Sequence, residues 1–326
     1  MPRVASISQR RKVTPQAVPI AAMPEPGIVE TRKSLPRRVA RWVALLFLCF
    51  LVYRVAAVYV VRPHACEPPP APAQPLIEQV RDGRAAEYPA RSGAIELKAM
   101  SYNIQGHAVL LHPDHLGAVA EVIRKIAPDV VALQEVHDGT LQSRFENQLE
   151  ELARDTGMTA AFGTSMRSYG GRYGNAILTR GTITGSRVHR LPGRGEPRSL
   201  HETTVLFDGQ PVNIYVTHLA SWGRLQRSSR SSQIACIVEI IRRSPHPFIL
   251  MGDFNTTPGN PEIAPLTEGP LVRHSVNPSK PTHILTQQHI DYIFPDAGWD
   301  TVSADVVQEG PSDHWPITAT LISGTR

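Results

Sequence analysis

The stretch Ile249-Leu250-Met251-Gly252-Asp253-Phe254-Asn255 is the most informative segment of the chain, because a continuous apolar run ends there in small and polar residues. The run from residue 248 to 253 predicts a buried strand. Gly252 allows a close backbone approach, and the spacing of Asp253 and Asn255 lets a carboxylate and an amide address one ligand. An Asp-x-Asn turn also forms for purely local reasons, so this segment alone does not separate a turn from a catalytic site.

Strand patterns of the same kind recur on both sides of this segment and decide the fold class. We expect strands over residues 95–103, 129–135, 174–179, 211–218, 289–294 and 317–321 in addition to 248–253. Apolar residues recur at helical spacing within 116–126 and 234–241. Strands outnumber helices, and short turns join several of them. The pattern predicts an α/β four-layer sandwich, in which two mixed β-sheets pack face to face and helices flank them.

The N-terminal part of the chain has a different character. Residues 42–61 form a run of 20 residues with one charge, Arg54, and this length suits a transmembrane helix. Residues 1–41 are polar and basic, which predicts a disordered cytoplasmic segment, and the Pro-rich residues 62–94 predict a tether. The positive-inside bias predicts a single-pass protein with its catalytic domain, residues 95–326, outside the cytoplasm. A buried soluble helix and a cleaved signal peptide are the alternatives.

Charge and cysteine usage bound the function classes. Residues 1–62 hold 11 of the 34 Lys and Arg and 2 of the 29 Asp and Glu, so the remainder has 23 basic and 27 acidic residues. A net charge of −4 over that remainder counts against a protein that coats DNA. Cys49, Cys66 and Cys236 are too scattered to indicate a disulfide framework, and Cys236 is interpreted as a small buried apolar residue.

Polar residues able to do chemistry stand at or near the ends of the expected strands. A rigid scaffold that projects side chains from strand ends into one rim commonly builds an active site. Taken singly, each has an ordinary structural explanation, such as a turn former, a solvated strand end or a buried histidine. The residues are Asn103, Glu135, His218, Asp253, Asn255, Asp291, Asp313 and His314.

Their joint occurrence in this order resembles the endonuclease/exonuclease/phosphatase superfamily. The resemblance spans about residues 95–321, and this superfamily includes pancreatic-type deoxyribonucleases, abasic-site endonucleases and neutral sphingomyelinases. Gln105 and His289 depart from residues that are frequent in the superfamily. The seven motifs are Tyr102-Asn103-Ile104, Leu133-Gln134-Glu135-Val136, Gly174-Asn175-Ala176-Ile177-Leu178, Thr217-His218-Leu219, Gly252-Asp253-Phe254-Asn255, Ile290-Asp291-Tyr292-Ile293 and Ser312-Asp313-His314.

The resemblance implies a divalent-metal-dependent hydrolase of phosphate esters that acts by in-line attack of an activated water. The metal would be Mg²⁺, with Mn²⁺ as an alternative, bound by Glu135 with Asn103 and Asp313 as contributors. The implied catalytic residues are Asp253, His314, His218, Asp291 and Asn255, with Asp253 activating the water and Asp291 positioning His314. Substrate-binding residues would be Asn175, Arg172 and Trp222.

Three functions remain open from the sequence. The first is a phosphodiesterase or nuclease, the second a phosphodiesterase of membrane-lipid headgroups, and the third a catalytically silent binding domain. The expected partners are a phosphate-ester substrate, either nucleic acid or lipid headgroup, and the membrane through residues 42–61; no obligate protein partner is implied. An arginine-rich segment, residues 167–198, is either a phosphate-tracking surface or a set of solvated loops.

Overall fold

The computed structural model describes Arg41, Leu45, Cys66 and residues 93–221, 223–273 and 279–323. The chain divides into two compact units, Met1–Phe50 and Leu51–Arg326, and the first contributes only Arg41 and Leu45, both helical, to the described residues. No helix among the described residues is long and apolar enough to cross a bilayer. Apart from Leu45, the membrane span expected at 42–61 lies outside them, as do most of the expected N-terminal segment and tether.

The second unit contains two β-sheets whose strands come from different parts of the chain. In the six-stranded sheet, β1 pairs in parallel with β2 and antiparallel with β11, so the sheet is mixed. Its order is β10 (Trp299–Val306), β11 (Ile317–Ser323), β1 (Glu96–Asn103), β2 (Val130–Asp138), β4 (Gly171–Thr179) and β3 (Thr159–Ser168).

The five-stranded sheet is mixed in the same way, because β7 and β8 are parallel while their outer neighbours are antiparallel. Its order is β5 (Thr182–Leu191), β6 (Arg198–Phe207), β7 (Gln210–His218), β8 (Phe248–Asp253) and β9 (Asp291–Pro295). In both sheets, the parallel pair lies in the interior and carries strands that are buried along nearly their whole length.

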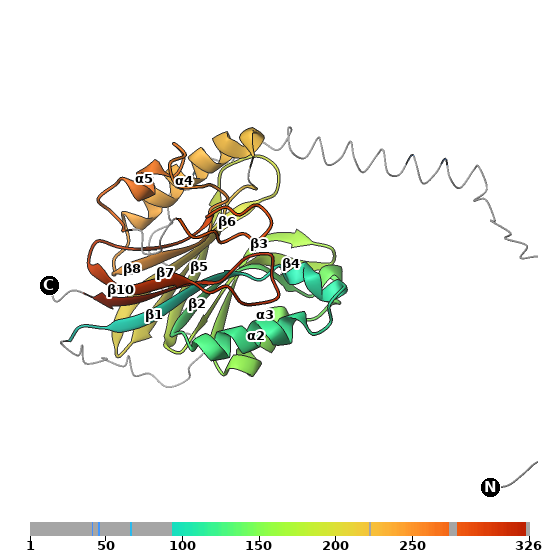
Figure 1. Ribbon diagram of the computed structural model, residues 1–326, viewed down its shortest axis with the longest axis horizontal. Coiled ribbons are helices and arrows are strands. Elements are labelled where there is room, and N and C mark those ends of the chain that lie inside the picture. Colours follow the sequence, from blue (N-terminus) through green and yellow to red (C-terminus); the bar gives the residue numbers. More distant parts are fainter. Residues whose placement is uncertain are drawn as a thin grey trace, which may run out of the picture. The chain divides into compact units, whose positions relative to one another are not determined.

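The two sheets pack face to face, and helices cover their outer faces (Figure 1). A buried cluster between the sheets joins Ala99 and Ala132 of one sheet to Ile214 and Met251 of the other. A second cluster lies beneath α2 (His115–Ile126) and α3 (Gln148–Thr156), and a third beneath α4 (Arg227–Ile241) and α5 (Ala264–Thr267). The expected two packed mixed sheets with flanking helices are therefore confirmed.

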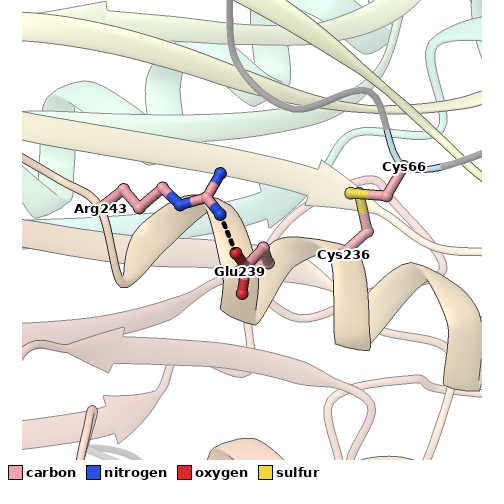
Figure 2. The surroundings of a disulfide bond; sticks show 4 residues. All are labelled: Cys66, Cys236, Glu239 and Arg243. Carbon is pink, nitrogen blue, oxygen red and sulfur yellow. Dashed lines mark hydrogen bonds and ion pairs between the residues drawn. A yellow bond between two sulfur atoms is a disulfide. The ribbon is translucent and has the colours of Figure 1, made fainter.

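The cysteines contradict the sequence interpretation. Cys236, on α4, forms a disulfide with Cys66, and their Cα atoms are 5.5 Å apart (Figure 2). Cys236 is indeed buried, with 3% of its surface exposed, but it is not simply a small apolar residue. The two positions are separated by 170 residues, and sequence spacing carries no information about a contact that the tertiary fold creates. The bond also joins Cys66, which the sequence placed in a semi-rigid Pro-rich tether, to α4 of the sandwich.

Candidate active site

The site lies where β1, β7 and β8 end and β9 begins. Because β7 and β8 are parallel with His218 opposite Asp253, the two side chains emerge at the same edge. Antiparallel pairing places Asp291, the first residue of β9, beside Asp253. Asn103, the last residue of β1, reaches the same point from the other sheet, so the site sits across the top of the sandwich interface.

Asp253 is the centre of this arrangement. Its Oδ2 accepts a hydrogen bond from Nδ2 of Asn103 at 3.2 Å and lies 3.4 Å from Nε2 of His218 and 3.7 Å from Nε2 of His314. Its Oδ1 accepts the backbone N–H of Asn255 at 2.9 Å. Burial, and then the charge of Asp291, raise the pKa of the Asp253 carboxyl to about 7. A carboxylate with a pKa near neutrality is suited to exchange a proton with water at physiological pH.

His314 and Asp291 form a buried pair, with Nδ1 of His314 2.8 Å from Oδ2 of Asp291. Burial opposes charging of the imidazole, but the carboxylates of Asp291 and Asp253 outweigh it and raise the pKa of His314 to about 10. Asp253, Asp291 and His314 are close enough together to suggest a metal cluster. Nδ1 of His314 already pairs with Asp291 and its Nε2 faces Asp253, so we interpret this group as an ion-pair network that stabilises an imidazolium.

Glu135 reaches the site through an irregularity in β2. Pairing with β4 shifts register between Leu133 and Val136, and Glu135 has a φ of 61°, which bends the strand. Its Oε1 accepts a hydrogen bond from Asn103 at 3.2 Å, and its Oε2 lies 3.6 Å from Nδ1 of His107. Burial opposes ionisation, but contacts from His107, His218 and Asn103 lower the pKa of Glu135 to about 2.

The group around Glu135 fits a divalent cation better than the group around His314. Glu135 is ionised at any physiological pH, and its side chain keeps 22% of its surface exposed. Among the described residues, the Asn103 amide oxygen accepts the N–H of Gln105 alone and retains a second lone pair. Asp313 is also partly exposed, at 30%, and its charge acts on His107 and His314. Carboxylate and amide oxygens with room for water are the ligands that Mg²⁺ prefers.

Backbone geometry fixes Asp253 and Asn255. A Cβ at Gly252 would stand 2.0 Å from the carbonyl oxygen of Thr217, so only glycine lets β7 and β8 approach this closely. Asn255 has a φ of 52°, and its Nδ2 donates to the carbonyl of Leu219 at 3.1 Å. The amide is therefore tied to the loop that follows His218.

The residues expected to bind substrate have mixed positions. Asn175 is buried, and its Nδ2 donates to the carbonyls of Ser199 and Val216. Arg172, near the start of β4, forms an ion pair with Asp138 at the end of β2 and lies over the ring of Phe162. Trp222 lies outside the described residues.

Two residues near the site were not singled out from the sequence. His107 contacts Glu135, and its position in the loop after Asn103 was the available signal. Arg198 is 8% exposed, and its charge acts on Glu135, Asp253 and His218. Most other arginines of segment 167–198 are exposed, and the sequence does not distinguish the buried Arg198 from them.

Comparisons with known proteins agree with this fold. A sequence model of the Endonuclease/Exonuclease/phosphatase family matches residues 100–314. Protein cwh43 of Schizosaccharomyces pombe is 28% identical over 136 residues, which are 41% of this chain and 14% of that protein, so the match spans a small part of this curated relative.

Solved structures share the fold at low identity. An endonuclease/exonuclease/phosphatase from Beutenbergia cavernae is 24% identical with a TM-score of 0.56, over 70% of this chain and 72% of that one. A mannosyl-6-phosphatase from Bacteroides thetaiotaomicron is 18% identical with a TM-score of 0.58, over 69% and 99%. These structures are similar in fold alone.

The family match covers more than half of the chain, and the chain belongs to the endonuclease/exonuclease/phosphatase family. Members of this family are divalent-metal-dependent hydrolases of phosphate esters.

Proposed function

We propose that this chain is a Mg²⁺-dependent phosphodiesterase that hydrolyses its substrate by in-line attack of water on phosphorus. The observation that carries the proposal is the position of Asp253, whose Oδ2 is within 3.7 Å of polar atoms of Asn103, His218 and His314. The Asp253 carboxylate thus faces three side chains, each of which can donate a hydrogen bond or carries a positive charge. Such an arrangement suits a water that must lose a proton beside a phosphate that gains charge.

Each residue has a role in this reaction. Asp253 orients the water and takes its proton as the new P–O bond forms. The imidazolium of His314, held by Asp291 at 2.8 Å, donates from Nε2 to a phosphoryl oxygen. Burial and the charge of Arg198 lower the pKa of His218. Its imidazole is therefore neutral and donates a hydrogen bond without adding a second charge. The ester P–O bond breaks, and the leaving oxygen takes up a proton from solvent.

A divalent cation held by Glu135, with Asn103 and Asp313, would neutralise charge on the phosphoryl group. Asn255 would hold a further phosphate oxygen, although its Nδ2 already bonds to Leu219, so it would act by rotating or by sharing that donor. Arg172, near the start of β4, and Asn175, in the middle of the same strand, belong to the proposal as substrate-binding residues, and Trp222 as a stacking surface.

We also place the catalytic domain outside the cytoplasm, attached to a membrane by residues 42–61. The Cys66–Cys236 disulfide supports this location, because structural disulfides persist in oxidising compartments and are rare in the reducing cytosol. The basic flank before residue 42 supports the same orientation.

The test uses the full chain in detergent micelles with bis(p-nitrophenyl) phosphate as substrate. We expect turnover with Mg²⁺ and its loss with EDTA. Asp253→Asn keeps the size of the side chain and should lower the rate about 10²–10³-fold or more. Asp208→Asn, on the exposed β6–β7 turn, is the matched control and should leave the rate unchanged. A chain that turns over no phosphate ester with any divalent cation would be the silent binding domain instead.

A further inference from the structure

Exposed apolar side chains are concentrated at the active-site end of the sandwich. Of the large apolar residues that are exposed among the described ones, five lie in three neighbouring loops, and we call them the rim patch: Leu110, Leu111, Leu141, Phe145 and Tyr169. Leu111 is 82% exposed and Phe145 is 66% exposed. A single exposed leucine needs no explanation, but a contiguous group marks a surface that binds something.

The three loops of the rim patch touch one another. The N–H of Leu141 donates to the carbonyl of Tyr169 at 3.0 Å, which joins the loop after β2 to the β3–β4 turn. Nη2 of Arg144 donates to the carbonyl of Leu110 at 3.3 Å, which joins the same loop to the segment after β1. The patch is therefore one surface, although its residues span 60 positions of the sequence.

The backbone holds these side chains outward. Arg144, Phe145 and Tyr169 have φ values of 56°, 65° and 45°, a region that residues other than glycine seldom occupy. Buried Thr140 and Ser143 fix the turn by exchanging hydrogen bonds between side chains and backbone, and the N–H of Phe145 donates to the carbonyl of Thr140 at 2.7 Å. Strained backbone that its surroundings enforce is typical of ligand-binding sites. The exposure of Phe145 is thus built into the fold.

The same end of the molecule carries two further exposed leucines. Leu225, 82% exposed, follows β7 and its terminal His218, and Leu285, 81% exposed, lies in the loop of His283, whose ring packs against that of His314. Apolar tips thus come from five loops that each follow or adjoin a strand with a site residue. Elsewhere among the described residues, only Leu45, Val188 and Val302 are comparably exposed.

Exposed arginines accompany these tips. Arg144 lies in the same loop as Leu141 and Phe145, and Arg224 precedes Leu225. Arg167 lies on the β3–β4 hairpin, whose turn contains Tyr169. Apolar tips beside exposed guanidinium groups match the two layers of a bilayer surface, in which acyl chains lie beneath phosphate groups. A nucleic acid would match the arginines, but it offers no apolar layer to receive the leucines.

We propose that the active-site end docks on a lipid bilayer through the rim patch, and that the substrate is a phosphate ester in a membrane-lipid headgroup. This inference rests on the proposed function, because it names the substrate class of the same site. It accounts for a feature that hydrolysis of a soluble ester does not need, namely apolar tips on the loops that surround the catalytic carboxylate.

Chain length is compatible with this docking. If residues 42–61 span the membrane, Cys66 follows the end of the span by five residues, which reach at most about 18 Å when extended. In that case the disulfide to Cys236 would keep α4 within reach of the bilayer surface. Without the disulfide, a tether of residues 62–94 would not limit the distance between α4 and the bilayer in this way.

The test measures whether the rim patch enters the bilayer, independently of catalysis. The full chain is reconstituted into phosphatidylcholine vesicles with plain or brominated acyl chains, which quench tryptophan on contact. A tryptophan is introduced by Phe145→Trp, and the matched control is Val302→Trp, since Val302 is 61% exposed on β10 and outside the rim loops. Emission of each variant is compared with that of the unmodified chain, and Leu141→Trp repeats the measurement from a second position.

We expect the bromine-dependent quenching to be larger for Phe145→Trp and Leu141→Trp than for the unmodified chain, and unchanged for Val302→Trp. Turnover of bis(p-nitrophenyl) phosphate should be the same in all variants. If neither rim tryptophan is quenched more than that of Val302→Trp while turnover persists, the docking inference fails and the proposed function stands. If the rim tryptophans are quenched but no chain turns over a phosphate ester, docking stands and the proposed function fails. Quenching that DNA abolishes would show the rim to be a nucleic-acid surface and would overturn the inference.

Discussion

Replacing Cys66 by serine should open the Cys66–Cys236 disulfide with little damage to packing. Cys236 is the buried partner and keeps its place on α4, whereas Cys66 is only half-buried. The remaining effect is on the entropy of the unfolded chain, which the crosslink restricts by closing a loop across 170 positions.

The size of this effect follows from the two loops that the bond closes. In the unfolded chain, closing a loop of 170 residues lowers the conformational entropy, which stabilises the folded state by about 5 kcal/mol. In the folded chain, the bond still closes the stretch from Cys66 to Gly93, a loop of 93 − 66 = 27 residues. If residues 67–92 add no contacts, the net stabilisation is 1.5RT ln(170/27), about 1.6 kcal/mol. Contacts from that segment would raise the figure toward the larger value.

Thermal unfolding of the full chain in detergent measures this difference. For a domain of this size, about 1.6 kcal/mol corresponds to a fall in Tm of roughly 3–6 °C. Reduction of the unmodified chain with dithiothreitol should lower Tm by the same amount, and Cys66→Ser should be insensitive to it. Cys49→Ser, which removes a cysteine outside the bond, is the matched control and should leave Tm unchanged. An unmodified chain whose Tm does not respond to reduction would refute the reasoning.

Three other perturbations test the site and its support. Asp291→Asn removes the carboxylate that raises the pKa of His314, so the alkaline limit of activity should move down from about pH 10, and a pH–rate profile with the same alkaline limit would contradict the pairing. Gly252→Ala places a Cβ against the carbonyl of Thr217 and should move Asp253 enough to lower the rate about 10²-fold, with lost stability visible in urea unfolding. Burial lowers the pKa of His201 to about 4 in the folded chain. As the pH falls below 6.5, the His201 side chain is therefore protonated first in the unfolded chain. The free energy of unfolding should then drop by about 1.4 kcal/mol per pH unit between pH 6.5 and 4. His201→Gln should flatten that slope in urea titrations at several pH values, and an unchanged slope would assign the acid sensitivity to other groups.

The four strands of the two parallel pairs could be predicted from the sequence because burial on both faces produces a long apolar run, whereas β6, which is also interior but carries several polar residues, was not expected. β2 and β8 are buried along nearly their whole length, and both were expected within a few residues of their observed bounds. β5 and β10 are different, since they are edge strands whose exposed residues are mostly polar. Their stability comes from pairing with β6 and β11, which the local sequence does not encode, so neither was expected.

The candidate site was predictable in its members but not in its geometry. Strand ends identified Asp253, His218 and Asn103, because a change from apolar to polar residues is visible in the sequence. The position of the Glu135 side chain in the site depends on an irregular register in β2, and no residue pattern predicts that irregularity. The same limit applies to His107, which enters the site through a contact with Glu135 rather than from a strand end.

The loops beyond the strand ends carry the information that separates one family member from another. The buried carboxylates and imidazoles at the strand ends serve a phosphoryl group and would serve it in any ester. The fold fixes the loop residue Phe145 in a strained conformation and exposes both Phe145 and Leu141. A protein that gained nothing from these side chains would be more soluble with polar residues in their place. Their position on loops at the active-site end of the sandwich is therefore the feature from which the substrate is best inferred.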